Sequence, residues 1–426
     1  MGLEGSIYLN IVICDDEKSR RVGWKEKLDS MLGAEHPVTL LGEEFATGFR
    51  ELMKRREQAR KLRTGQDEQL SLTDLPDEAD WGEETAFDRA DVLLVDYDLF
   101  AFEPEEYLTG AIVAYMARCY SRCGVIVGVN EFGPNPFDLT LVDNTSSFAD
   151  LTIGEKQLDN PGLWFGIAQD SPSDRLRPWS WPALLDASER QAKRSEWVFE
   201  RLDAHVLEET GLDVVHDRLP RSAIGWLELA GRAEERTTLA GLARGKRLGY
   251  RRGDEAPSRG SVARVAAART AKWMETVVLP LQDVLIDAPH LLQRNAALLD
   301  AHLDELDSAD WNVSTRIPAG HDQCGLLTDV LPHAHTAPVW LSRPVFYWPK
   351  VSAASELRGV EAPYLVPAVD KVFCEDVSAF LPRDEARRFV SKLDSSSPVR
   401  WVASPIAPGR GWLMEVDYQP ISRLAM

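Results

Sequence analysis

The stretch Ile11-Val-Ile-Cys-Asp-Asp-Glu17 and the later stretch Asp91-Val-Leu-Leu-Val-Asp96 decide the fold of the first part of this chain. Each is a short apolar run that ends on carboxylates, which is typical of a buried strand in a parallel sheet. The further predicted elements are strands at 38–41, 124–129 and 150–153, and helices at 18–32, 47–62 and 106–118. Strands and helices that alternate in this way predict an α/β fold, a doubly wound parallel five-stranded sheet.

The carboxylates at the strand ends indicate a binding site. Ligands of such sheets bind at the carboxyl ends of the strands, where Asp15, Asp16 and Asp96 are expected to meet. Carboxylate oxygens suit Mg²⁺, and with the metal bound one aspartate can act as a nucleophile towards a phosphoryl group. The alternative is that Asp15 and Asp16 only cap the following helix, which leaves Asp96 unexplained.

These motifs, in this order, resemble the receiver domain of response regulators, a family with a flavodoxin-like fold. Thr109-Gly-Ala-Ile-Val-Ala-Tyr-Met-Ala-Arg118 is similar to the third helix of that family, and the resemblance covers about residues 8–160. It implies that Asp15 and Asp16 form the metal-binding pair and that Asp96 accepts the phosphoryl group. The same resemblance implies that the backbone carbonyl of Asp98 completes a Mg²⁺ site.

The chain departs from the receiver pattern at two positions. The fourth strand of the family ends in a serine or threonine, whereas Val127-Gly-Val-Asn130 has no hydroxyl group. The lysine that follows the fifth strand matches Lys156 only if one residue is inserted; otherwise Lys156 is a solvated surface lysine. The receiver is therefore expected to be atypical, either switching in an unusual way or binding only metal.

Beyond about residue 165 no family is recognised. We expect a receiver-like domain at 1–165, a mainly helical region at 176–310, and an α+β region at 311–426 that can form one output domain with the helical region. The predicted helices are 184–209, 223–243, 261–287 and 289–307, and the predicted strands are 339–341, 345–347, 400–402 and 412–416.

The net charge of −20 is unevenly distributed. Residues 1–175 hold 34 acidic and 17 basic side chains, whereas residues 176–426 hold 34 and 31. The segment 64–88 has nine acidic residues and no basic one, which predicts a solvated or disordered insertion; a docking site for a basic partner is the alternative. The stretch 236–272 has ten basic residues against two acidic ones. We expect it to form a solvated loop or to contact the acidic half, because no DNA-binding motif accompanies it.

A small group of histidines and a cysteine in the last third of the chain is a further candidate site. His321, Cys324, His333 and His335 could gather as zinc ligands or could be polar surface. The five cysteines are few and scattered, which predicts reduced thiols in a cytoplasm. No apolar run is long enough to cross a bilayer, and no triad, Walker loop or dinucleotide motif indicates an enzyme beyond Mg²⁺-dependent self-phosphorylation.

The function expected from the resemblance is that of a cytoplasmic, bacterial signalling protein of a two-component system. A histidine kinase or phosphotransfer protein would phosphorylate Asp96, and the C-terminal region would act as an output or partner-binding module. The alternatives are a pseudo-receiver scaffold, a phosphate buffer in a stress or phage-defence phosphorelay, and an effector enzyme gated by the receiver. A protein effector and a homodimer are left open as partners, whereas nucleic acid and membrane are not expected.

Overall fold

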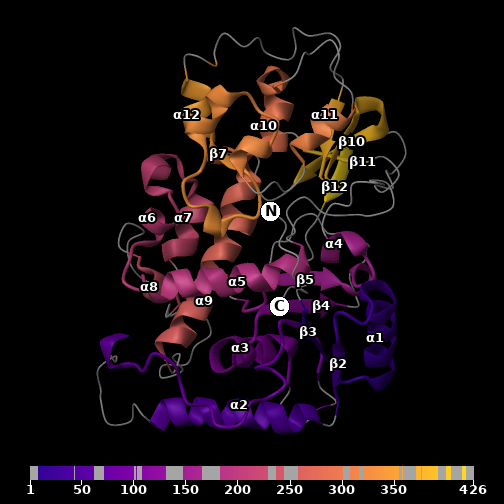
Figure 1. The fold of residues 1–426 in the computed structure, drawn as a ribbon, viewed down its shortest axis with the longest axis vertical. Helices are drawn as coiled ribbons and strands as arrows, with labels where there is room; N and C mark the ends of the chain where they lie inside the picture. Colours follow the sequence, from indigo (N-terminus) through magenta and orange to yellow (C-terminus); the bar gives the residue numbers. More distant parts are fainter. Residues whose placement is uncertain are drawn as a thin grey trace.

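A computed structural model gives the fold of the chain (Figure 1). It describes residues 8–42, 44–61, 72–99, 102, 108–130, 147–165, 183–228, 237–243, 258–300, 308–315, 320–354, 357, 371–375, 377–391, 400–403 and 415–418. Within this part of the chain, no helix combines the length and the apolar character that crossing a bilayer requires. All five cysteines lie in described segments, and all are buried and free of disulfides.

A five-stranded sheet in the order β2-β1-β3-β4-β5 organises the first part of the chain. Its strands are β1 (Ile11–Cys14), β2 (Val38–Leu41), β3 (Val92–Asp96), β4 (Val125–Asn130) and β5 (Leu151–Gly154). Every pairing is parallel. The sheet is therefore the doubly wound parallel one that the alternation of strands and helices predicts, with the strand order of the flavodoxin-like folds.

Helices cover both faces of this sheet because alternate residues of each strand point to opposite sides. Ile11 and Ile13 of β1 lie in one apolar cluster, whereas Val12 and Cys14 lie in the other. The first cluster packs under α1 (Lys18–Leu32), α4 (Pro161–Phe165) and the start of α5 (Leu184–Phe199), and the second under α2 (Glu44–Lys61) and α3 (Gly110–Tyr120). Helix α5, which the sequence pattern placed with the following region, thus belongs to the cover of the sheet (Figure 1).

The acidic segment before β3 is packed where the structure describes it, from Leu72 onward. Trp81 and Phe87 are buried, and the guanidinium of Arg55 in α2 lies over the Trp81 ring. Arg55 also forms a bidentate ion pair with Asp88, at 2.9 and 3.0 Å. The described part of the segment buries more than its composition indicates, because Arg55 of α2 pairs with Asp88 and the aromatic residues Trp81 and Phe87 complete the core.

We expect Arg55→Met to lower the free energy of unfolding by about 3–5 kcal/mol, because the change leaves the buried Asp88 carboxylate without its charge partner. Lys54→Met is the matched control, since Lys54 is the neighbouring residue and its side chain is 70% exposed. The control should change the free energy by less than about 0.5 kcal/mol. Chemical unfolding of both variants is the measurement. Equal losses of unfolding free energy in the two variants would contradict a stabilising role for the Arg55–Asp88 pair.

The acidic segment also contacts the basic stretch 236–272, as the opposite charges suggest. At the start of α9 (Arg259–Trp273), Arg259 pairs with Asp77 at 2.8 Å and Arg264 pairs with Glu78 at 3.2 Å. The backbone N–H of Gly260 donates to the carbonyl of Asp77. The intramolecular contact is therefore present, and it joins the first part of the chain to the helical region.

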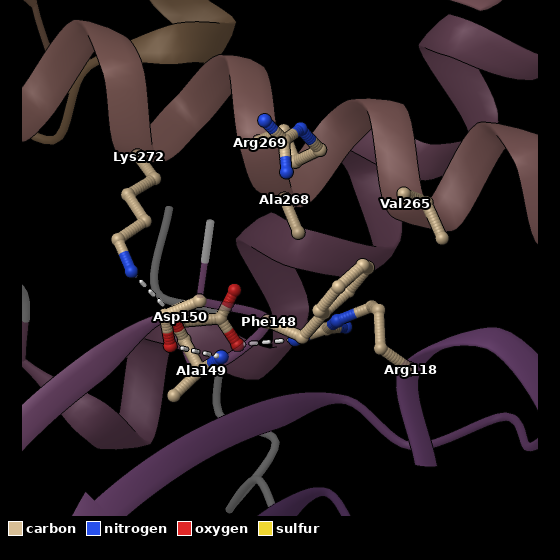
Figure 2. Close-up of a pocket in the computed structure, with 9 residues that line it drawn as sticks. Arg118, Phe148, Ala149, Asp150, Val265, Ala268, Arg269 and Lys272 are labelled. Carbon is tan, nitrogen blue, oxygen red and sulfur yellow. Dashed lines mark hydrogen bonds and ion pairs between the residues drawn. The ribbon is translucent and has the colours of Figure 1, made fainter. Parts of the chain in front are cut away.

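Helix α9 is the central element of that region. Its residues from 260 to 273 are all buried except Arg264, and it packs against α3, α5 and α8. Figure 2 shows the contact of α9 with the segment that leads into β5, where Lys272 donates to the carbonyl of Ala149 at 2.8 Å. In the same segment, Asp150 pairs with Arg118 of α3. The cavity left there has a volume of about 10 Å³, room for about one water molecule.

The predicted long helices are shorter in the structure. The helices after α5 are α6 (Val206–Glu209), α7 (Arg221–Glu228), α8 (Leu239–Ala243), α9, α10 (Ala288–Arg294), α11 (Ser308–Val313) and α12 (Trp348–Ala353). Periodicity alone extended α9 to residue 287, but a π-helical turn at 274–278 and a 3₁₀ turn with Pro280 end it. Such turns break the α-helical ladder without removing the apolar pattern.

Two small sheets complete the fold. The first pairs β6 (Leu285–Asp287) with β7 (Val345–Tyr347). The second has the order β12-β10-β11-β8-β9, with β8 (Lys371–Cys374), β9 (Ala379–Pro382), β10 (Ala386–Ser391), β11 (Arg400–Ala403) and β12 (Glu415–Tyr418). The predicted strand at 339–341 is wrong: Pro338 begins a 3₁₀ turn there. The arrangement of helices and mixed sheets agrees with the predicted helical and α+β regions.

Candidate acidic site at the carboxyl edge of the sheet

The register of β1 and β3 brings the predicted carboxylates together. Cys14 lies opposite Val95 in the parallel pair, so the next residues, Asp15 and Asp96, lie side by side at the carboxyl ends of β1 and β3. Asp15 is fully buried and Asp96 is 2% exposed. Together with the half-buried Asp16 they offer oxygen atoms that all lie within 4.8 Å of one another. Among the described residues this is the only group of three or more acidic, histidine or cysteine side chains that could hold a metal ion.

Asp15 is fixed by the turn between β1 and α1. Its Oδ1 accepts the backbone N–H of Glu17 at 2.7 Å, and its own carbonyl accepts a hydrogen bond from Arg21. Glu17, not Asp15 or Asp16, occupies the N-cap position of α1, and its side chain makes no capping hydrogen bond. Neither aspartate of the acidic pair is therefore the N-cap residue. The other oxygen of Asp15, Oδ2, is buried and accepts no hydrogen bond.

Arg20 supplies a positive charge to the site, and no sequence motif had indicated it. Its Nη1 donates to Asp96 Oδ2 at 2.9 Å, and its Nε lies 3.5 Å from Asp15 Oδ2. Its Nη2 donates to Glu17 Oε2 at 2.8 Å. The position of Arg20 in the sequence could have indicated this role, because a residue in the first turn of α1 lies close to the end of the strand that precedes the helix.

The partners of Asp15 compensate only part of the cost of burying its charge. Desolvation raises the pKa of its carboxyl from 3.8 to about 6, even though the Glu17 N–H bond and the Arg20 charge both lower the pKa. The folded chain therefore holds the Asp15 proton more tightly than the unfolded chain does. This carboxylate costs stability above about pH 6, and the cost disappears as the pH falls towards 4.

We expect Asp15→Asn to stabilise the metal-free protein at pH 8 by up to on the order of 3 kcal/mol, because the amide removes the buried charge and can still accept the Glu17 N–H. The gain should shrink by roughly half at pH 5, where the wild-type carboxyl is protonated in the folded state. Thermal unfolding of both proteins at the two pH values measures it. A variant that is less stable at pH 8 would contradict this electrostatic account.

The receiver resemblance also singles out the end of β4, a lysine after β5 and the carbonyl of Asp98. Val129 of β4 lies opposite Asp96 in the sheet register, so an apolar residue stands beside the expected acceptor. Lys156 lies in the short 3₁₀ helix that follows β5, and its side chain lies outside the described residues. Asp98 is exposed and forms an isolated bridge with Thr109. The roles of Lys156 and of the Asp98 carbonyl stay predictions.

Three of the four candidate zinc ligands, His321, Cys324 and His335, use their polar atoms on backbone carbonyls. His335 bonds the carbonyl of Thr210 at 2.7 Å, and His321 bonds the carbonyl of Val345 at 3.1 Å. Burial lowers the pKa of His335 to about 4. With Cys324 and His333, these residues are described, and they do not form a metal-binding group.

Comparison with protein-family models, with curated proteins and with solved structures found no match. The class of the chain therefore rests on its own geometry. That geometry is a parallel sheet of flavodoxin-like strand order with an acidic site at its carboxyl edge, the place where such sheets bind their ligands.

A second buried polar cluster lies in the C-terminal part, and no sequence pattern indicated it. His290 of α10 bonds Asp287 at 2.6 Å through Nδ1 and Glu375 at 3.1 Å through Nε2. Arg400 of β11 pairs with both oxygens of Glu375. All four residues are at most 4% exposed, so no substrate reaches them. The cluster joins α10 to the second small sheet.

The charge of His290 should make this junction pH-dependent. Burial alone lowers the pKa of the imidazole, but Asp287 and Glu375 outweigh burial and hold the pKa above 6.5. A pKa raised in the folded state gives stability that is complete below the unfolded value and is lost as the pH rises through the folded value. The protonated form is thus the stabilising one.

We expect His290→Gln to destabilise the protein at pH 6 by about 3–5 kcal/mol, because one partner of a buried charged network is lost. The difference from wild type should become smaller at pH 9, because the stabilising proton of the wild-type imidazole is lost as the pH rises. Calorimetry of both proteins at the two pH values is the measurement, and a difference that does not become smaller as the pH rises would contradict a raised pKa for His290.

Proposed function

We propose that this chain is a response-regulator-like signalling protein whose phosphoacceptor is Asp96. The observation that carries the proposal is the cluster of Asp15, Asp16 and Asp96 at the carboxyl edge of the sheet. Three carboxylates so close together, two of them buried, need a cation to offset their repulsion. The proposed partners are a histidine kinase or a phosphotransfer protein as donor, and a protein effector that the C-terminal region contacts.

The residues present fit a divalent cation. The cluster offers only hard oxygen ligands, which Mg²⁺ prefers, and Asp15 Oδ2 is a buried acceptor without a hydrogen bond. When bound, Mg²⁺ would neutralise the negative charge that keeps a phosphoryl donor away. Asp15 and Asp16 would hold it, together with Asp96.

The chemistry proposed for the chain is a single transfer. A carboxylate oxygen of Asp96 attacks the phosphorus of a phosphorylated donor, an O–P bond forms, and the bond between phosphorus and the donor breaks. With a phosphohistidine the leaving group is the imidazole, and with acetyl phosphate it is acetate. Asp96 stands at the end of a buried strand, so its position is held by the backbone of β3 and by its pair with Arg20.

The same site supports a second candidate function, a pseudo-receiver that takes no phosphate and acts through protein contacts. Two observations favour it: Arg20 already pairs with the acceptor carboxylate, and Val129 stands beside Asp96 without a hydroxyl group. A phosphoryl group on Asp96 would lack the side-chain hydroxyl that responds to it in ordinary receivers. The two candidates differ in whether Asp96 reacts at all.

Incubation of the purified chain with Mg²⁺ and acetyl phosphate or phosphoramidate should add one phosphoryl group, measured by intact mass. Asp96→Asn should abolish the adduct because the amide is not a nucleophile. Asp29→Asn is the matched control, since Asp29 is an exposed aspartate near the far end of α1 and has no expected role in the site; it should leave the adduct in place. No adduct with either donor would reject phosphorylation and favour the pseudo-receiver.

A further inference from the structure

Arg20 occupies the acidic site in a way that sets it apart from a surface ion pair. Its guanidinium contacts Asp96, Asp15 and Glu17 at once, and the side chain is only 17% exposed. A planar fork with several N–H groups can bridge two carboxylates as a divalent cation would. The site therefore already contains a positive charge.

We propose that Arg20 is a resident counter-ion of the acidic site, which a divalent cation must displace from Asp96 in order to bind. The inference rests on the metal site of the proposed function and concerns how occupancy of that site is regulated. Two positive groups cannot share the same carboxylate oxygens without repulsion, so metal and guanidinium compete for Asp96 and Asp15.

The geometry gives Arg20 a second position. Its Nη2 is already bonded to the exposed Glu17, at 2.8 Å, so the guanidinium can move away from Asp96 and keep one partner. When the guanidinium has moved away, the buried Oδ2 of Asp15, which accepts no hydrogen bond, can act as a metal ligand. Metal binding is then coupled to a rearrangement at the first turn of α1, next to the strand end that carries the acidic pair.

The competition predicts that loss of the guanidinium charge opens the site. Arg20→Gln should bind Mn²⁺, the probe for the divalent cation, at least about tenfold more tightly than wild type. Coulomb's law at an effective protein dielectric allows a larger gain, but a partly exposed guanidinium can turn to solvent, so tenfold is the smallest change that we expect. Arg20→Lys keeps the charge without the fork and should lie between the two.

The measurement is Mn²⁺ binding to the full chain by calorimetry or electron paramagnetic resonance, without any phosphodonor. Lys25→Gln is the matched control: it removes one charge from the same helix, and Lys25 bonds the carbonyl of Val38 at the start of β2, away from the site. The control should bind Mn²⁺ as wild type does. Thermal unfolding without metal shows whether each variant is folded.

The outcomes separate this inference from the proposed function. Tighter binding by Arg20→Gln, or binding by that variant alone, supports displacement. Equal or weaker binding overturns displacement and leaves the metal site standing. If a folded Arg20→Gln binds no Mn²⁺ at millimolar concentration, the metal site fails and displacement fails with it. Phosphorylation of Asp96 is tested separately by the mass measurement and does not enter these outcomes.

Discussion

The parallel pairing of β1 with β3 is the constraint on which the site depends. Because Cys14 lies opposite Val95, the backbone itself places the carboxylates of Asp15 and Asp96 together at the edge of a buried sheet. No side chain has to arrange this. As a consequence, two like charges lie next to each other in a poorly solvated position. The ion pair of Asp96 with Arg20 offsets part of their repulsion.

Much of the fold followed from hydrophobic patterning. The strands, the helices between them and the parallel topology were predictable because a buried parallel strand is a short, continuous apolar run, as β1, β3 and β4 are. The edge strands β2 and β5 each include a threonine, and their positions between helices indicated them. The limits of the later helices were not predictable in the same way. The apolar pattern continues beyond Trp273, where the backbone changes to π and 3₁₀ turns, and periodicity does not distinguish these from an α-helix.

The residues of the candidate site that lie at strand ends were predictable from the sequence. Asp15, Asp16 and Asp96 come together because strand ends converge at one edge. The contact of Arg20 with these carboxylates could not be predicted without the orientation of α1 over the strand end. The His290 cluster could not be predicted because it joins segments about 85 residues apart. Such contacts depend on tertiary packing, which no local pattern specifies.

Charge neutralisation explains more than the site. The acidic segment before β3 is packed because Arg55, Arg259 and Arg264 supply cations from α2 and α9, so an excess of negative charge in sequence becomes a set of paired charges in space. The acidic site is different: Arg20 leaves one buried oxygen of Asp15 without a hydrogen bond, and the carboxyl keeps a raised pKa. Paired charges hold a structure together, whereas an under-neutralised buried carboxylate stores free energy that a binding cation can release. Asp96 has Val129 rather than a hydroxyl residue beside it and pairs with Arg20, so the displacement of Arg20 proposed above would act first on α1.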